Sequence, residues 1–231
     1  MASIINSTDT GSGGLITTGD SSDELQIQTA ETTAVTITSG QQSAFIAGTA
    51  SAPAVTTTGD LNTGIYFPAA DNIGFTTGGT IRGRWTDDGL CFGSDTAAAN
   101  ALSDYEQGTF TPTAVGGTTA GTTTYSEQQG SYTKIGRQVT LSVKLAWSAL
   151  TGTGNLIFGG FPFTSANDGM EYLGAIMVDS LNWSAGTYVQ FYKSPNSTTG
   201  LIFCMTDDAA WNIQQCTNET VTLRFTITYF V

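Results

Sequence analysis

The sequence predicts an all-β protein in two parts: an intertwined N-terminal β shaft of hairpin repeats, then a C-terminal jelly-roll-like β-sandwich, assembled as a homotrimer. Three observations favour this fold class. Thr, Gly, Ser and Ala dominate the 231 residues, of which only 11% are charged. Short runs alternate apolar residues with Thr, a pattern typical of strands that bury one face. Clusters of Gly and Asp separate these runs and are expected to form turns.

Composition excludes several classes of function. Seven Lys and Arg stand against nineteen Asp and Glu, the net charge is −12, and His is absent. The chain therefore has no basic face with which to bind nucleic acid, and it lacks His as a catalytic base or metal ligand. No stretch reaches the roughly 18 apolar residues of a membrane span, and the first residues lack the features of a signal peptide. We expect no nucleic-acid partner, membrane insertion, metal or cofactor.

A strand–turn–strand pattern occurs twice in the front part of the chain, at a constant offset of 48 residues. The segment 23–38 aligns with the segment 71–86, and periods of this size usually indicate repeated supersecondary units. In each copy, the apolar residues alternate along the strands. We predict that these residues form the trimer core of the shaft: Leu25, Ile27, Val35, Ile37, Ile73, Phe75 and Trp85.

These repeats carry too little apolar surface to be stable alone. A hairpin with two or three apolar residues on one face is marginal in water. The same segment of another chain could cover that face, so we predict an intertwined homo-oligomer up to about residue 100. Three-fold symmetry is favoured because three identical sets of strands can close a thin β-prism without a free edge. The alternative interpretation is a disordered linker rich in Thr and Gly.

The predicted strands become longer and more hydrophobic after Asp95–Asp104. This segment has no strand pattern, and we expect it to be a short helical turn or a hinge. We predict three regions: residues 1–48 with the first repeat, 49–103 with the second repeat and a linker, and 104–231 as the β-sandwich. The expected sandwich strands are Phe110–Val115, Tyr132–Ile135, Val139–Trp147, Leu156–Phe158, Tyr172–Leu181, Tyr188–Tyr192, Leu201–Met205 and Val221–Val231.

The three cysteines are interpreted as reduced, small hydrophobic residues. They are Cys91, Cys204 and Cys216, and no Cys-x-x-Cys spacing suggests a metal site. A disulfide between Cys204 and Cys216 across a hairpin remains an alternative.

Three stretches resemble bacteriophage tail-fibre proteins. The segment 1–29 resembles the N-terminal segment of small fibres, and 52–75 is similar to a fibre-shaft element. Asp104–Pro112, with GSYTKIG from Gly130 and GGFPF from Gly159, resembles the C-terminal β-domain of such fibres. The resemblance implies a homotrimer in the virion, assembled in the host cytoplasm. It also implies that residues 1–48 attach to baseplate or tail proteins, and that 104–231 bind a polysaccharide or protein on the host cell surface.

Exposed aromatic residues are the candidates for receptor binding. Trp183 and Trp211 lie between predicted strands beside polar turn residues, where an indole can stack on a sugar ring and Asp or Asn can hydrogen-bond its hydroxyls. The alternative is that both Trp residues cap the core or fill the trimer interface. Because the protein is acidic, we expect a neutral or amine-bearing glycan. The candidate residues are Trp183, Trp211, Tyr172, Asn196, Asp207 and Asp208.

No residues are assigned to catalysis, and we expect the protein not to be an enzyme. Glycan cleavage needs two carboxyls about 5–10 Å apart across a cleft. The adjacent pairs Asp87-Asp88 and Asp207-Asp208 are interpreted as solvated turn residues instead. A tailspike that degrades polysaccharide and a non-adhesive structural adaptor of the tail remain the alternative functions.

Overall fold

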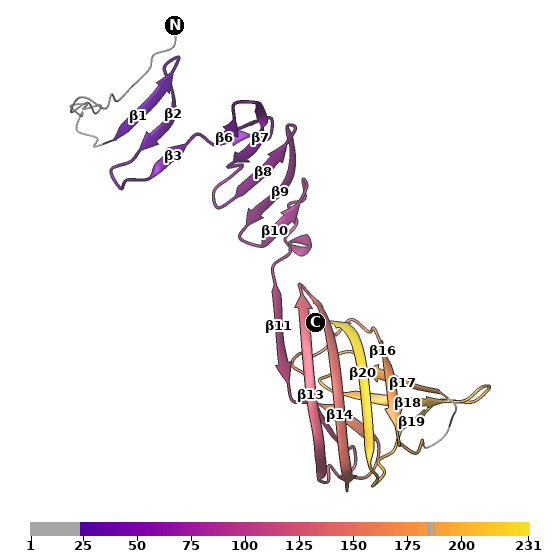
Figure 1. Cartoon of the computed structure of the whole chain (residues 1–231). Coiled ribbons are helices and arrows are strands. Elements are labelled where there is room, and N and C mark those ends of the chain that lie inside the picture. The colour runs from indigo at the N-terminus through magenta and orange to yellow at the C-terminus, as the bar shows by residue number, and fades with distance from the viewer. Residues whose placement is uncertain (1–23, 184–185, 187) are drawn as a thin grey trace. The chain divides into compact units, whose positions relative to one another are not determined.

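The computed structural model describes residues 24–183, 186 and 188–231, and the part of the predicted tail attachment that lies in residues 1–23 falls outside them. The chain divides into two compact units, Met1–Ala101 and Leu102–Val231. The all-β prediction is confirmed, because the described residues form strands, one 3-10 turn and no α-helix (Figure 1). That turn, η1 (Ala98–Asn100), lies in the segment expected to be a helical turn or hinge.

The described part of the first unit has three small antiparallel sheets, with strand orders β1-β2-β3, β4-β5 and β10-β9-β8-β7-β6. Their strands are β1 (Leu25–Thr29), β2 (Thr32–Ile37), β3 (Ser43–Phe45), β4 (Gly48–Thr49), β5 (Ala52–Pro53), β6 (Val55–Thr57), β7 (Asp60–Tyr66), β8 (Ile73–Thr77), β9 (Thr80–Thr86) and β10 (Gly89–Phe92).

The sequence repeat is also a repeat of backbone geometry. Its copies form the hairpins β1–β2 and β8–β9. Their turns, Ala30-Glu31 and Gly78-Gly79, all have positive φ angles between 50° and 73°, as a two-residue type I′ turn requires. The strand register shifts after Ile27 in one hairpin and after Phe75 in the other. The 48-residue offset therefore preserves the turn, the register and the irregularity in the ladder.

The second unit is one continuous, curled antiparallel sheet with the order β11-β13-β14-β20-β16-β17-β18-β15-β12 and β19 paired to β18 (Figure 1). Its strands are β11 (Tyr105–Phe110), β12 (Thr113–Gly116), β13 (Thr123–Ile135), β14 (Gln138–Leu150), β15 (Leu156–Gly159), β16 (Tyr172–Asp179), β17 (Tyr188–Lys193), β18 (Gly200–Met205), β19 (Asn212–Ile213) and β20 (Val221–Phe230).

The curl brings the last strand of this order back beside the second. Ala114 of β12 donates its N–H to the Tyr125 hydroxyl of β13 (2.6 Å), and Thr123 Oγ1 of β13 donates to the Ala114 carbonyl (2.6 Å). These side chains replace a backbone ladder between β12 and β13, so the sheet encloses a core without closing fully. β11 and β12, consecutive in the chain, thereby form the two edges.

The enclosed core is apolar and aromatic. Phe191 and Phe225 stack with ring centroids 3.8 Å apart, and Phe158 and Phe161 meet them edge-on. Trp147 and Tyr229 are the largest side chains that are fully buried. Such a core removes its apolar surface from water within one chain, so this unit does not need a partner to cover it.

The observed strands refine several predicted boundaries. The expected strand Phe110–Val115 is divided by Thr111-Pro112, since proline has no N–H for a ladder. The expected strand Tyr132–Ile135 is the end of the longer β13. The Cys204 thiol donates to Gln214 Oε1 (3.2 Å), and the Cys216 thiol lies 3.7 Å from the Val115 carbonyl, as expected of reduced side chains.

Candidate functional site

The predicted shaft core of the first repeat lies on one face of the β1-β2-β3 sheet. Leu25 pairs with Ile37, Ile27 pairs with Val35, and Val35 pairs with Phe45 of β3, so these five side chains share a face. In the single chain Ile27 is 53% exposed and Phe45 is 44% exposed. The opposite face is polar and carries a hydrogen-bond cluster of Gln26, Gln28 and Thr33. This sheet therefore has an apolar face that the described residues of the chain leave uncovered.

The second repeat shows the same arrangement. Ile73 pairs with Trp85, and Phe75 lies two residues along the same strand, so their side chains share a face. Trp85 is 55% exposed, and Phe92, opposite Gly83 on the same face, is 64% exposed. The other face is covered within the unit, where Tyr66, Thr76 and Cys91 are buried and the Thr76 hydroxyl donates to the Ala50 carbonyl (2.7 Å).

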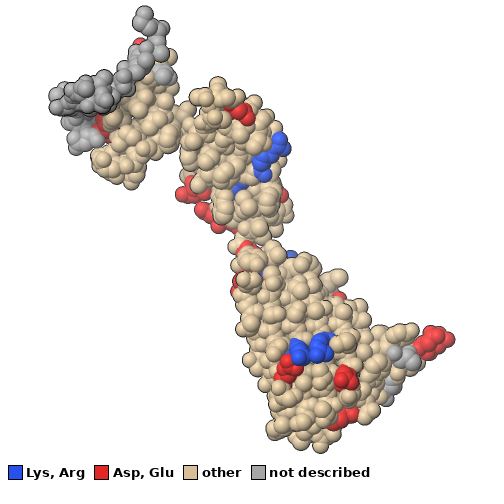
Figure 2. Space-filling view, viewed as in Figure 1, with Lys and Arg blue, Asp and Glu red and all other residues tan. Residues whose placement is uncertain are grey.

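A different surface is formed by the three predicted residues around the β18–β19 turn. Asp207 and Asp208 are in this turn, and Asp208 has a φ of 56°. Figure 1 shows β18 and β19 extending away from the rest of the sheet, and Figure 2 shows acidic atoms at the tip of that extension. Trp211, just before β19, is 60% exposed.

Trp211 is the end of an aromatic row on the outer face of β17 and β18. Its ring packs edge-on against Phe203 (centroids 4.3 Å apart), and Phe203 packs against Tyr192 (4.5 Å). The Tyr192 hydroxyl donates to Glu171 Oε1 (2.9 Å), and burial raises the pKa of Tyr192. Tyr188, on the same face of β17, is 68% exposed. We call Tyr188, Tyr192, Phe203 and Trp211 the aromatic row.

Sequence reasoning missed three members of this row. Tyr188, Tyr192 and Phe203 lie in the predicted strands Tyr188–Tyr192 and Leu201–Met205, for which no outer face is predicted. The signal was present, because Tyr188 and Tyr192 alternate with core residues in β17, as Phe203 does in β18.

The remaining predicted receptor-binding residues lie elsewhere. Tyr172 is a correction: the residue is only 7% exposed and its ring packs against that of Tyr229 (centroids 6.1 Å apart), because its position in β16 points inward. Burial raises the pKa of this phenol, whose hydroxyl donates to Asp168 (3.0 Å). Asn196 is exposed in the turn after β17, and its N–H donates to the Ala166 carbonyl (3.0 Å).

Trp183 follows β16 and is 40% exposed. The preceding Asn182 is held by two hydrogen bonds to the Glu219 carboxylate, at 3.0 and 2.6 Å. The structure thus gathers Trp211, Asp207 and Asp208 around one turn and leaves Trp183, Tyr172 and Asn196 in other environments.

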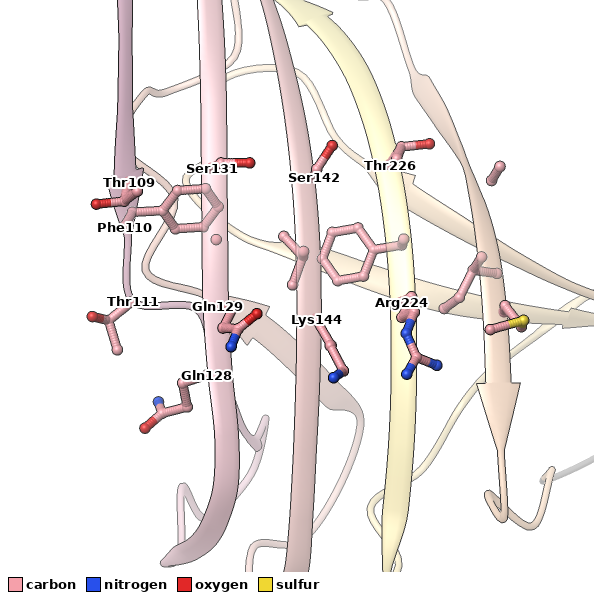
Figure 3. A pocket seen from close by; sticks show the side chains of 16 residues that line it. Thr109, Phe110, Thr111, Gln128, Gln129, Ser131, Ser142, Lys144, Arg224 and Thr226 are labelled. Carbon is pink, nitrogen blue, oxygen red and sulfur yellow. The ribbon is translucent and has the colours of Figure 1, made fainter.

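The second unit also has a hollow of about 960 Å³ across β11, β13, β14, β20 and β16, which the sequence did not predict. Lys144 of β14 and Arg224 of β20 are paired directly across the ladder, and Figure 3 shows their charged ends side by side. Lys144 forms an ion pair with Glu127 (2.5 Å). The side chains that project around this pair are Gln129, Ser131, Ser142 and Thr226. We call this surface the basic groove.

No group of three or more His, Cys, Asp or Glu able to hold a metal is found in residues 24–183, 186 and 188–231. Asp87 and Asp88 lie in a turn beside a small hollow of about 300 Å³ that also includes Arg84. Within the same described ranges, the structure has no helix with the length and hydrophobicity of a membrane span.

Comparison with known proteins found no family model, curated protein or solved structure that matches this chain.

Proposed function

We propose that this chain is a structural and adhesive component of a bacteriophage tail. In this proposal, three chains intertwine through their first units to form a shaft, which attaches to the baseplate or tail by the N-terminal region. The jelly-roll-like second unit recognises a polysaccharide or protein of the host surface. The fibre-like motifs support the proposal, and one structural observation carries it: in the described part of the first unit, both repeats have an apolar sheet face that is exposed.

Those faces need a cover. Burial of apolar surface stabilises by about 25 cal/mol per Å², and a small sheet with a bare apolar face does not obtain this contribution within its own chain. Side chains such as Ile27 and Trp85 are more than half exposed in the single chain. Covering them with equivalent residues of other chains supplies the missing burial.

The placement of the acidic residues permits copies of the same chain to serve as the cover. Identical chains of net charge −12 repel each other, so a contact between them must keep acidic groups apart. Every acidic residue in the described part of the first unit lies at a strand end or outside the strands, away from the middle of the apolar faces. Three copies suit this arrangement, because three small sheets can enclose one apolar axis while each protects the edges of its neighbours.

The aromatic row supports the adhesive part of the proposal. Exposed Trp and Tyr rings provide large, rigid contact areas for sugars and proteins, and their polar atoms hydrogen-bond. Trp211 is 60% exposed although Phe203 holds its ring in place, so it is oriented before a ligand arrives. The acidic turn beside it offers carboxylates as acceptors for hydroxyl groups.

Adsorption of the labelled intact chain to host bacteria tests this function. We expect saturable adsorption that competes with infection by the virus. Trp211→Ala should lower it at least tenfold, since hot-spot aromatic residues contribute about 2 kcal/mol or more. Tyr105→Ala is the matched control, because Tyr105 is a 63% exposed aromatic residue outside the row, and it should adsorb normally.

Other outcomes would replace the proposal. A trimer that does not adsorb would be a structural adaptor. Release of new reducing ends from host polysaccharide would identify a tailspike enzyme. Antibodies against the chain should decorate the tail in images of the virion, and labelling confined to the capsid would contradict a tail location.

A further inference from the structure

The basic groove has a charge pattern that folding alone does not explain. Lys144 and Arg224 are direct cross-strand partners, and like charges in this position destabilise a sheet. The chain has only seven basic residues and nineteen acidic ones, so two neighbouring basic residues are not expected from its composition. Figure 2 shows a mostly uncharged surface on this face of the second unit, in which a blue pair lies beside red atoms.

Of these two basic residues, only Lys144 has an acidic partner among the described residues. Glu127 compensates Lys144 through the 2.5 Å ion pair. Arg224 lies between Lys144 on one side and Met177 on the other, since Met177 of β16 is its second cross-strand partner. The ion pairs found among the described residues all belong to Lys134 or Lys144. The guanidinium of Arg224 is thus exposed to an incoming anion.

The surroundings of this guanidinium are hydroxyls and amides. Ser131, Ser142 and Thr226 are cross-strand partners in one row, two residues along the strands from the charged row. Adjacent strands lie about 4.8 Å apart, so their hydroxyls are evenly spaced donors and acceptors. Gln129 extends the charged row beyond Lys144. Such a lining suits a ligand with many hydroxyl groups.

An apolar platform completes the groove. Met177 is 59% exposed beside Arg224, and the small Ala175 lies next to Thr226. A thioether packs well against the C–H face of a sugar ring because it is flexible and polarizable.

We propose that the basic groove binds an acidic saccharide. Arg224 holds its anionic group in a bidentate hydrogen-bonded pair, with Lys144 as the second cation. Ser131, Ser142 and Thr226 bind its hydroxyls, and Met177 contacts the ring. The assignment rests on the proposed function only for the source of the saccharide, the host surface. It differs from the expectation of a neutral or amine-bearing glycan, because Lys144 and Arg224 line the groove and no acidic residue does.

Calorimetric titration of the intact chain tests this site. The probes are a uronic acid oligosaccharide, its neutral methyl ester, and a phosphorylated form of the neutral sugar. We expect the uronic acid to bind at least tenfold more tightly than the ester, because a hydrogen bond to a charged group contributes more than a neutral one. Binding should weaken at high salt. The phosphorylated probe shows which anion the groove prefers, and tighter binding of either anion over the neutral sugar supports the site.

Substitutions assign the binding to this groove. Arg224→Gln should lower uronic acid affinity at least tenfold, and Arg224→Lys should give an intermediate loss because the charge remains but the planar fork is lost. Arg82→Gln removes the same charge from the first unit and should bind as the unmodified chain does. Oligomeric mass and circular dichroism check that each variant is folded.

Three results would overturn the assignment. They are equal affinity for the acid and the ester, unchanged binding by Arg224→Gln, and equal loss in the Arg82→Gln control. A change in oligomeric mass in Arg224→Gln would identify the groove as a contact between copies instead. Failure of anion binding with normal adsorption to bacteria removes only this inference. Anion binding without adsorption removes only the fibre function.

Discussion

The two units place the same types of apolar residue in different environments. In the second unit a single curled sheet directs its apolar side chains into a shared interior, and many are fully buried. In the described part of the first unit the buried apolar side chains are Pro53, Tyr66 and Cys91, while the largest apolar residues of the repeats remain exposed. Alternation therefore predicts a strand with two unlike faces, but not whether the same chain covers the apolar face.

Two tryptophans offer the sharpest test of this contrast. Trp147 is 1% exposed in the second unit, and Trp85 is 55% exposed in the first. Trp147→Ala leaves a large cavity and should lower the free energy of unfolding of the second unit by about 3–5 kcal/mol, measured by denaturant titration. Trp85→Ala should leave that transition unchanged and instead weaken association. An equal loss from both substitutions in the same transition would contradict the division of roles.

Polar substitutions on the apolar faces should weaken the oligomer. Ile27→Thr and Phe75→Thr keep β-propensity while removing apolar surface, so we expect a loss of about 1.5–3 kcal/mol per substituted chain in association. Sedimentation over a range of protein concentrations measures this change. Thr36→Ser, on the polar face of the sheet that contains Ile27, is the control. Equal dissociation of all three variants would contradict association through the apolar faces.

The second unit also buries a cation. Lys193 is fully buried, donates to the Ser197 carbonyl and lies 4.9 Å from the centroid of the Tyr229 ring. Burial lowers the pKa of Lys193 to about 8, well below its value in an unfolded chain. Above that pH Lys193 of the folded chain has released a proton that the unfolded chain still binds, so this group contributes a rise in stability with pH of up to about 1.4 kcal/mol per unit.

Lys193→Met isolates this effect. The rise between about pH 8 and pH 9.5 should vanish in the variant, whatever its absolute stability. Above this window the tyrosines begin to titrate, and burial raises the pKa of Tyr229, which acts in the opposite direction. Denaturant titrations of both proteins across the window measure the slopes. Parallel slopes would show that Lys193 is not the group responsible.

The smallest effect is expected from the ion pair beside the basic groove. The Lys144 side chain is 34% exposed and that of Glu127 is 26% exposed, so solvent screens their attraction. Glu127→Gln should change the free energy of unfolding by less than about 1 kcal/mol. The same variant should strengthen uronic acid binding, because it frees Lys144. Weaker binding would show that Glu127 organises the groove rather than competing with the ligand.

The sequence predicts features that depend on residues close together in the chain, but not features that depend on residues far apart. The turns at Ala30-Glu31 and Gly78-Gly79 and the hairpins around them are local, and the 48-residue offset revealed them. The pairing of β15 with β12 joins residues far apart, and no pattern in either strand specifies it. Whether the strands of the second unit would form one curled sheet or two packed sheets therefore could not be read from alternation alone.

The candidate sites show the same limit. The exposure of Trp211 could be predicted because a Trp in a polar turn is a local signal, whereas Tyr172 is buried because its position in the strand turns it inward. The basic groove was missed because Lys144 and Arg224 are distant in sequence and meet only through the β14–β20 register. Local chemistry suggested recognition, but pairing register decided which side chains meet.

Sedimentation equilibrium of the intact chain decides whether three chains share the apolar axis, since it measures mass without assuming shape. A species three times the 24.1 kDa chain mass that persists on dilution is the expected result. A stable species of a single chain mass, with the first unit folded, would contradict the shared apolar axis and the fibre built on it.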